Sequence, residues 1–86
     1  MEKAKALYFI DERGVHVVLP TREVSWIKGY DNSDIAQEGI PLNYWIVIKS
    51  KDGELFVINY ENNKKERDMY LEKLRHWYFI LPLRDE

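Results

Sequence analysis

The sequence predicts one small α+β domain, residues 1–86, in which a bent antiparallel sheet of about five strands packs against one C-terminal helix. Two observations carry this prediction. Short apolar runs separated by turns fill the chain as far as residue 60, which is typical of antiparallel strands. Beyond residue 61 the spacing of apolar residues changes from two to about 3.6, which indicates a helix. No repeat, linker or low-complexity segment divides the chain, so we expect a single domain.

The first three strands are predicted from short apolar runs and the residues that interrupt them. Residues 6–10 and 15–19 are rich in β-branched and aromatic side chains, and a charged turn ending in Gly14 separates them. Glycine tolerates the positive φ of such turns, so the two runs predict a hairpin. Pro20 lacks the N–H that a central strand needs and ends the second strand. A third strand begins within residues 24–27.

The second hairpin has the clearest local signal. Residues 44–50 and 55–60 are both apolar and flank the dipeptide Asp52-Gly53. Asp-Gly between two apolar runs favours a tight hairpin turn. These runs therefore predict the fourth and fifth strands.

The helix is predicted within residues 61–81. Its apolar residues at spacings of three and four are Tyr70, Leu71, Leu74, Trp77, Tyr78 and Leu81. The side-chain oxygens available for its N-cap are those of Asn59, Asn62 and Asn63. Pro82 disfavours its continuation. We expect it to contact the sheet through Tyr70, Leu71, Leu74 and Trp77, with Trp26 and Phe9 or Tyr8 on the sheet side of the core.

The segment 28–43 is long for a connection in a compact domain, so it is either functional or partly helical. One helical turn is predicted over residues 35–38, capped within residues 31–33 and stopped by Gly39. The segment carries three carboxylates against one lysine, Lys28. The carboxylates are those of Asp31, Asp34 and Glu38.

Charge and composition exclude several classes of protein. Lys and Arg number 13 against 15 Asp and Glu, which gives a net charge of −2, and cysteine is absent. A duplex or lipid binder usually carries a basic excess, so bulk charge implies neither partner. The apolar runs are too short for a signal peptide or a membrane span. We expect a cytoplasmic protein.

Catalytic and metal-binding patterns are missing. The two histidines, His16 and His76, have no second ligand at a usual spacing, so no metal is expected. The serines and threonines lie in no nucleophile motif, and the four glycines are explained by turns. The pairs Asp11-Glu12 and 85–86 are expected to be solvated. We therefore expect neither enzymatic activity nor a cofactor.

The aromatic content is the main indication of a binding surface. Three Trp, six Tyr and three Phe exceed what so small a core holds, and both faces of the predicted fourth and fifth strands are apolar. Either the sheet curls until both faces are covered or one face binds a partner. Our leading hypothesis is a non-enzymatic protein-interaction or adaptor module. Its candidate contact residues are Tyr30, Asp31, Asp34, Glu38, Trp45 and Tyr60.

Nucleic-acid binding is the alternative function. A basic patch near one end of the second hairpin and the helix start is predicted from Lys49, Lys51, Lys64, Lys65 and Arg67. The competing interpretation is a solvated helix face, because acidic residues alternate with these side chains.

The residues of the second hairpin and the helix resemble a known family. The run 44–60, followed by 66–74 with its Leu-x-x-Leu spacing, looks like the end of a pleckstrin-homology-like module, and Trp26-Ile27 resembles a strand of its bacterial versions. The resemblance implies a half-barrel plugged by a helix. The phosphoinositide signature of that family is absent around residues 11–14, so the resemblance implies protein binding rather than lipid recognition.

Three further interpretations remain open. The order of strands and helix is similar to the LytTR-type DNA-binding domain, although residues 79–86 end acidic where that family is basic. A short acidic-leaning chain also fits a small virus- or mobile-element-encoded inhibitor of a host enzyme, whose acidic loop occupies a basic groove. A homodimer through an exposed edge strand is the third.

Overall fold

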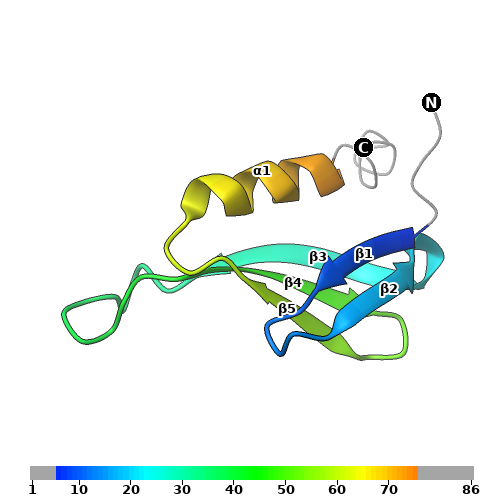
Figure 1. Ribbon diagram of the computed structural model, residues 1–86, viewed down its shortest axis with the longest axis horizontal. Helices are drawn as coiled ribbons and strands as arrows, with labels where there is room; N and C mark the ends of the chain where they lie inside the picture. The colour runs from blue at the N-terminus through cyan, green and yellow to red at the C-terminus, as the bar shows by residue number, and fades with distance from the viewer. Residues whose placement is uncertain (1–5, 76–86) are drawn as a thin grey trace.

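The computed structural model describes residues 6–75, which form strands followed by a helix (Figure 1). The strands are β1 (Ala6–Ile10), β2 (His16–Pro20), β3 (Val24–Asp31), β4 (Tyr44–Ser50) and β5 (Leu55–Asn59). A short 3₁₀ helix, η1 (Thr21–Glu23), joins β2 to β3, and α1 (Lys64–Leu74) follows β5. The predicted α+β class, with five antiparallel strands and a C-terminal helix, is confirmed for these residues.

The five strands are divided between two sheets. β1 pairs with β2, and a three-stranded antiparallel sheet has the order β3-β4-β5. The break falls at Pro20 and η1, where the chain leaves the first hairpin. One backbone hydrogen bond, from Glu12 N to Val57 O at 2.8 Å, connects the β1–β2 turn to β5. The sheets are not closed into a barrel, so the single bent sheet expected from the sequence is replaced by two.

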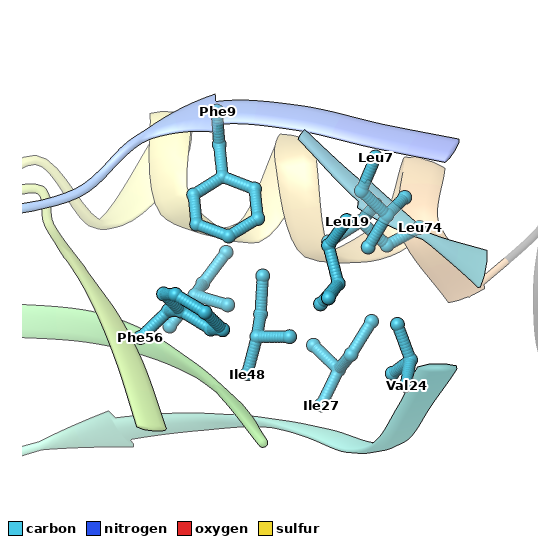
Figure 2. Packing of buried hydrophobic residues seen from close by; sticks show 9 residues of the cluster. Leu7, Phe9, Leu19, Val24, Ile27, Ile48, Phe56 and Leu74 are labelled. Carbon is cyan, nitrogen blue, oxygen red and sulfur yellow. The ribbon is translucent and has the colours of Figure 1, made fainter. Parts of the chain in front are cut away.

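The core lies on one face of the three-stranded sheet. Both α1 and the β1–β2 hairpin cover this face, and Figure 2 shows their side chains pointing toward those of the sheet. Ile46 and Ile48 of β4 and Leu74 of α1 are fully buried. The remaining buried apolar residues of the cluster are Leu7, Phe9, Leu19, Val24, Ile27 and Phe56. Their burial supplies most of the free energy that holds the two sheets and the helix together.

A β-bulge near the start of β3 decides which of its side chains face the core. Val24 pairs with Ser50, and Trp26 pairs with the residue directly before it in β4, Lys49, so Ser25 is an extra residue without a partner of its own in β4. One extra residue reverses the side-chain alternation that follows it. Val24 and Ile27 are therefore both buried, while Trp26 lies on the opposite face. The prediction that Trp26 lines the core is wrong for this reason.

The turns of the two predicted hairpins contain glycines in the conformation that the sequence predicts. Gly14 and Gly53 have φ of 84° and 96°, which strongly favours glycine at both positions. Ser50 N donates to Glu54 O at 2.9 Å and closes the predicted Asp-Gly turn. The second hairpin is thus confirmed.

Asp11 is buried, which corrects its interpretation as a solvated turn residue. Its carboxylate accepts hydrogen bonds from the backbone N–H groups of Arg13 at 2.9 Å and Val15 at 3.0 Å. The Arg13 guanidinium donates to the other oxygen at 2.6 Å from Nη2. A buried carboxylate needs such partners, and here it organises the β1–β2 turn.

The helix α1 begins at Lys64 because Asn63 caps it. Asn63 Oδ1 accepts from Glu66 N at 3.1 Å, so one of the three predicted caps is the one used. Tyr70 and Leu71 pack against the core cluster and Leu74 enters it. The expected contacts of Trp77, and the helical positions of Tyr78 and Leu81, lie outside the described residues.

The segment after β3 differs from the prediction. β3 continues to Asp31, so Lys28 and Tyr30 belong to the strand and not to a loop. Residues 35–38 form no helical turn, because Gln37 and Ile40 instead exchange two backbone hydrogen bonds around Gly39. The remaining loop, residues 32–43, extends beyond the sheet in Figure 1.

Candidate interaction surface

The face of the three-stranded sheet that points away from α1 carries aromatic, aliphatic and basic side chains, and we refer to it as the outer face. Strand pairing arranges it in three rows across β3, β4 and β5. The first row is Trp26, Lys49 and Leu55; the second is Lys28, Val47 and Val57; the third is Tyr30, Trp45 and Asn59. In Figure 1 no helix or strand of residues 6–75 covers this face.

The apolar residues of the outer face surround an open groove of about 390 Å³. Its lining consists of Glu12, Trp26, Tyr30, Trp45, Val47, Leu55 and Val57. Glu12 reaches the groove from the β1–β2 turn, beside Val57, whose carbonyl accepts from Glu12 N. The groove is thus bounded by side chains of β3, β4, β5 and one turn.

Exposure on the outer face is high for side chains of this type. Leu55 and Tyr30 expose 54% and 44% of their surface, whereas Trp26 and Trp45 are half-buried. Lys28 Nζ lies 4.5 Å from the Trp26 ring centroid, within cation–π range. Among residues 6–75, these side chains form a contiguous, partly exposed apolar patch.

Arg67 of α1 contacts the backbone of β3 and β4 from the core side of the sheet. The guanidinium Nη1 donates to Tyr30 O at 2.9 Å and to Trp45 O at 3.3 Å. Its Nε donates to Asp68 Oδ1 at 2.8 Å, and the guanidinium carbon lies 5.2 Å from the Tyr44 ring centroid. One buried cation therefore ties together the two strands that present Tyr30 and Trp45.

Gly29 gives Arg67 the space it occupies. A Cβ at this position would lie 2.9 Å from Leu71 Cδ2 and 3.1 Å from Arg67 Nη1. Glycine therefore allows α1 to approach β3 closely at the point where Tyr30 follows in the chain. At this point α1 packs against the side of β3 that is opposite the outer face.

The structure brings together two of the predicted contact residues, Tyr30 and Trp45, which pair across β3 and β4. Asp31 follows them at the end of β3, where Ser33 N and Oγ both donate to its carboxylate and lower its pKa. Asp34 and Glu38 are exposed on the loop. The loop thus places Asp34 and Glu38 beyond the Tyr30 end of the outer face, whereas Asp31 pairs with Tyr44 on the α1 side of the sheet, where Arg67 and Lys64 also lower its pKa.

Tyr60 lies apart from the other candidates. It packs against the core cluster beside Tyr70, and burial raises the pKa of its hydroxyl to about 12, assisted by Tyr70 and Glu66. A shallow depression next to it is lined by Tyr60, Glu66, Met69, Tyr70 and Lys73. Tyr60 is therefore not part of the outer face.

The five residues of the predicted basic patch do not share one surface. Tyr44 N donates to Glu61 O at 2.7 Å, which places the start of α1, with Lys64 and Lys65, at the beginning of β4. Lys51 lies past the other end of β4, roughly 20 Å away along the strand. Lys49 belongs to the outer face, and Arg67 is buried.

Sequence reasoning missed five outer-face residues as candidates: Trp26, Lys28, Val47, Leu55 and Val57. Alternation along β4 and β5 does place Val47, Leu55 and Val57 on the face of Trp45. The β3 residues could not be placed in this way, because the bulge at Ser25 leaves no signal in the sequence.

Other sites and matches were sought in the described part of the chain. Residues 6–75 contain no group of three metal-ligating side chains that could hold an ion. No helix among them is long and apolar enough to cross a membrane. Comparison of the chain with protein-family models, curated proteins and solved structures gives no match. The pleckstrin-homology-like and LytTR-like resemblances stay predictions.

Proposed function

We propose that this domain is a non-enzymatic protein-interaction module whose outer face binds a partner protein. The observation that carries the proposal is the groove between Trp26, Tyr30 and Trp45, which no helix or strand of residues 6–75 covers. Tryptophan and tyrosine dominate the energetically important centres of protein interfaces, because they bury large areas with little loss of side-chain entropy.

The support beneath the groove favours a binding role over an accidental apolar patch. Trp45 belongs to β4, whose Ile46 and Ile48 are fully buried in the core. Arg67 Nη1 donates hydrogen bonds to the carbonyl groups of Tyr30 and Trp45. A surface fixed in this way loses little conformational entropy when a partner binds. Charged side chains at its margin, including Lys28 and Glu12, match the polar rim of known interfaces.

Site-specific photo-crosslinking tests the proposal. A benzophenone amino acid replaces Leu55 on the outer face, and in a matched control it replaces Val18, which is 67% exposed on β2. In extracts of the source cells we expect a discrete protein adduct from position 55 that survives nuclease treatment. Equal labelling from both positions, or none from position 55, contradicts the proposal. An adduct removed by nuclease favours the nucleic-acid alternative.

A further inference from the structure

Charge on the outer face is unevenly distributed. The strands of the outer face carry two charged residues, Lys49 of β4 in the first row and Lys28 of β3 in the second, whereas Glu12 reaches the groove from the β1–β2 turn beside Val57 of β5. Both lysines lie next to Trp26, since Lys49 pairs with it and Lys28 Nζ lies over its ring. A ligand that uses the Trp26 end of the groove therefore meets two positive charges.

The opposite end of the outer face carries no positive charge. Tyr30, Trp45 and Asn59 form the third row, and the loop that follows β3 carries the exposed carboxylates of Asp34 and Glu38. Negative charge on a ligand is thus favoured beside Lys28 and Lys49 and meets no cation of the outer face in the third row. The face selects for a ligand whose charges are confined to one side.

The size of the outer face limits what it binds. Three rows on three strands measure roughly 14 Å by 17 Å, or about 240 Å². A stable dimer commonly buries about 800 Å² on each partner. A second copy docked through this face alone falls well short of that area, whereas a short peptide segment covers it.

We propose that the outer face binds a short peptide segment with one apolar or aromatic anchor and carboxylates on one side of that anchor. The anchor enters the groove between Trp26, Trp45 and Val47, and the carboxylates meet Lys28 and Lys49. This inference rests on the proposed function and names the chemistry of the partner. Its carboxylates give specificity and orientation, while the anchor supplies most of the binding free energy.

A single-stranded nucleic acid fits the same face less well. Stacking on Trp26, Tyr30 and Trp45 is compatible with bases, but a strand carries one phosphate per nucleotide along its whole length. Those phosphates would extend over the third row, where Tyr30, Trp45 and Asn59 include no cation, and past the Glu12 carboxylate beside Val57. A peptide confines its charges to the two rows that hold the lysines.

Selection from a phage-displayed library of random short peptides tests the inference. We expect the enriched peptides to share a Trp, Phe or Leu anchor with Asp or Glu on one side of it. Enrichment of basic peptides, of anchors without acidic neighbours, or of nothing above background overturns the inference. An oligothymidine or oligouridine that binds more tightly than every selected peptide overturns it in favour of nucleic acid.

Charge reversal identifies the residues responsible. In the double variant Lys28→Glu, Lys49→Glu we expect the best acidic peptide to bind about tenfold more weakly at low salt, with the loss shrinking as salt is added. Replacing its carboxylates by lysines restores binding to this variant. The control Lys65→Glu makes the same charge change on exposed α1, across the sheet, and leaves binding unchanged. Should the double variant unfold, Lys28→Gln, Lys49→Gln takes its place.

The two proposals fail in different ways. Discrete adducts from position 55 without any preference for acidic peptides overturn the inference and leave the interaction module standing. Acidic peptides that bind equally well to the wild type and to the variant Lys28→Glu, Lys49→Glu overturn the assignment to Lys28 and Lys49. Absence of position-55 adducts overturns the proposed function, and with it the peptide site.

Discussion

Arg67 is the residue on which the attachment of α1 to the sheet depends most directly. Its Nη1 bonds to the carbonyl groups of Tyr30 and Trp45, and its Nε to Asp68, while the side chain is only 9% exposed. A buried guanidinium is stable only while its donors are satisfied, and here the carbonyl groups of two paired strand residues and one carboxylate satisfy them. The same side chain thus connects the helix, two strands and the outer face.

Replacing Arg67 by alanine is expected to lower the free energy of unfolding by about 2–4 kcal/mol, because its buried hydrogen bonds to two carbonyl groups are lost and a cavity is left between α1 and the sheet. Urea unfolding followed by circular dichroism measures the loss. Arg75→Ala, which removes an exposed arginine near the end of the same helix, is the control and is expected to change stability by less than about 0.5 kcal/mol. Equal effects from both variants would falsify the role assigned to Arg67.

The burial of Arg67 could not be predicted from its neighbours in the sequence. Residues 64–68 read Lys-Lys-Glu-Arg-Asp, which is typical of a solvated helix face. Its burial depends on Gly29, 38 residues earlier, whose missing side chain opens the space for the guanidinium. Only the packing of α1 on β3 shows this relationship.

Asp11 is the second residue whose environment departs from its expected one. Burial of its carboxyl works to raise the pKa, but the hydrogen bonds from Arg13 and Val15 outweigh burial and hold the pKa below the usual 3.8. Because the pKa is lower in the folded state, the folded protein binds the proton less tightly than the unfolded chain. The stability that Asp11 contributes is therefore complete above pH 3.8, the ordinary pKa of the carboxyl, and is lost as the pH falls through the folded-state pKa.

Asp11→Asn is expected to lower the urea midpoint near pH 7 and to reduce the gap from the wild type as the pH falls through the folded-state pKa of Asp11, below which the wild-type carboxyl is also protonated. Urea titrations at several pH values measure both midpoints. Asp34→Asn, exposed on the loop, is the matched control, and its midpoint is expected to follow the wild-type curve. A constant gap between Asp11→Asn and the wild type at every pH contradicts the assignment.

At the scale of elements, the bulge in β3 determines which side chains form the outer face. If Ser25 were paired as a regular strand residue, the alternation that buries Val24 would place Trp26, Lys28 and Tyr30 toward the core. Lysine and tyrosine at those positions would meet Ile48 and Leu71, where a charged group is costly. The bulge therefore permits an apolar core and an aromatic outer face on the same strand.

Deletion of Ser25 is expected to keep cooperative unfolding and the near-ultraviolet circular dichroism signal of the tryptophans. Val24 and Trp26 already pair with the consecutive residues Ser50 and Lys49, so the shortened strand forms a regular ladder with the same residues on each face. Ser25→Ala keeps the residue count, removes only an exposed hydroxyl, and is expected to change stability by less than about 0.5 kcal/mol. A deletion variant that loses cooperative unfolding contradicts the assignment of Ser25 as the extra residue.

The strands and the helix start were predictable because their signals are local. Asp52-Gly53 specifies a tight turn through the φ of glycine, and Asn63 supplies an N-cap, as the sequence indicated. The end of β3, the bulge and the division into two sheets were not predictable. They depend on which residue of β4 meets which residue of β3, and this pairing has no local signature.

For the whole molecule, the decisive asymmetry lies between the two faces of the three-stranded sheet. One face is covered by both α1 and the β1–β2 hairpin, so folding buries its apolar surface. Within residues 6–75, the other face leaves Trp26, Tyr30, Trp45 and Leu55 at least partly exposed. The sequence predicted that both faces are apolar, but it left open whether the second was covered, because coverage depends on where the first hairpin packs.

Residues that serve binding rather than folding are removable at little cost in stability. Tyr30→Ser combined with Leu55→Ser is expected to lower the free energy of unfolding by less than about 1 kcal/mol, since both side chains are largely exposed. Ile48→Ala, on the covered face of the same sheet, is expected to cost about 2–5 kcal/mol. Urea unfolding compares the two.

The binding readout for these variants is competition for the adduct that the benzophenone derivative forms at position 55. An excess of unlabelled wild-type domain is expected to suppress that adduct, because both proteins present the same outer face to the partner. The variant Tyr30→Ser, Leu55→Ser is expected not to compete, although it remains folded. Competition by the folded double variant at wild-type strength would mean that the partner binds elsewhere, and the uncovered face would then have no part in recognition.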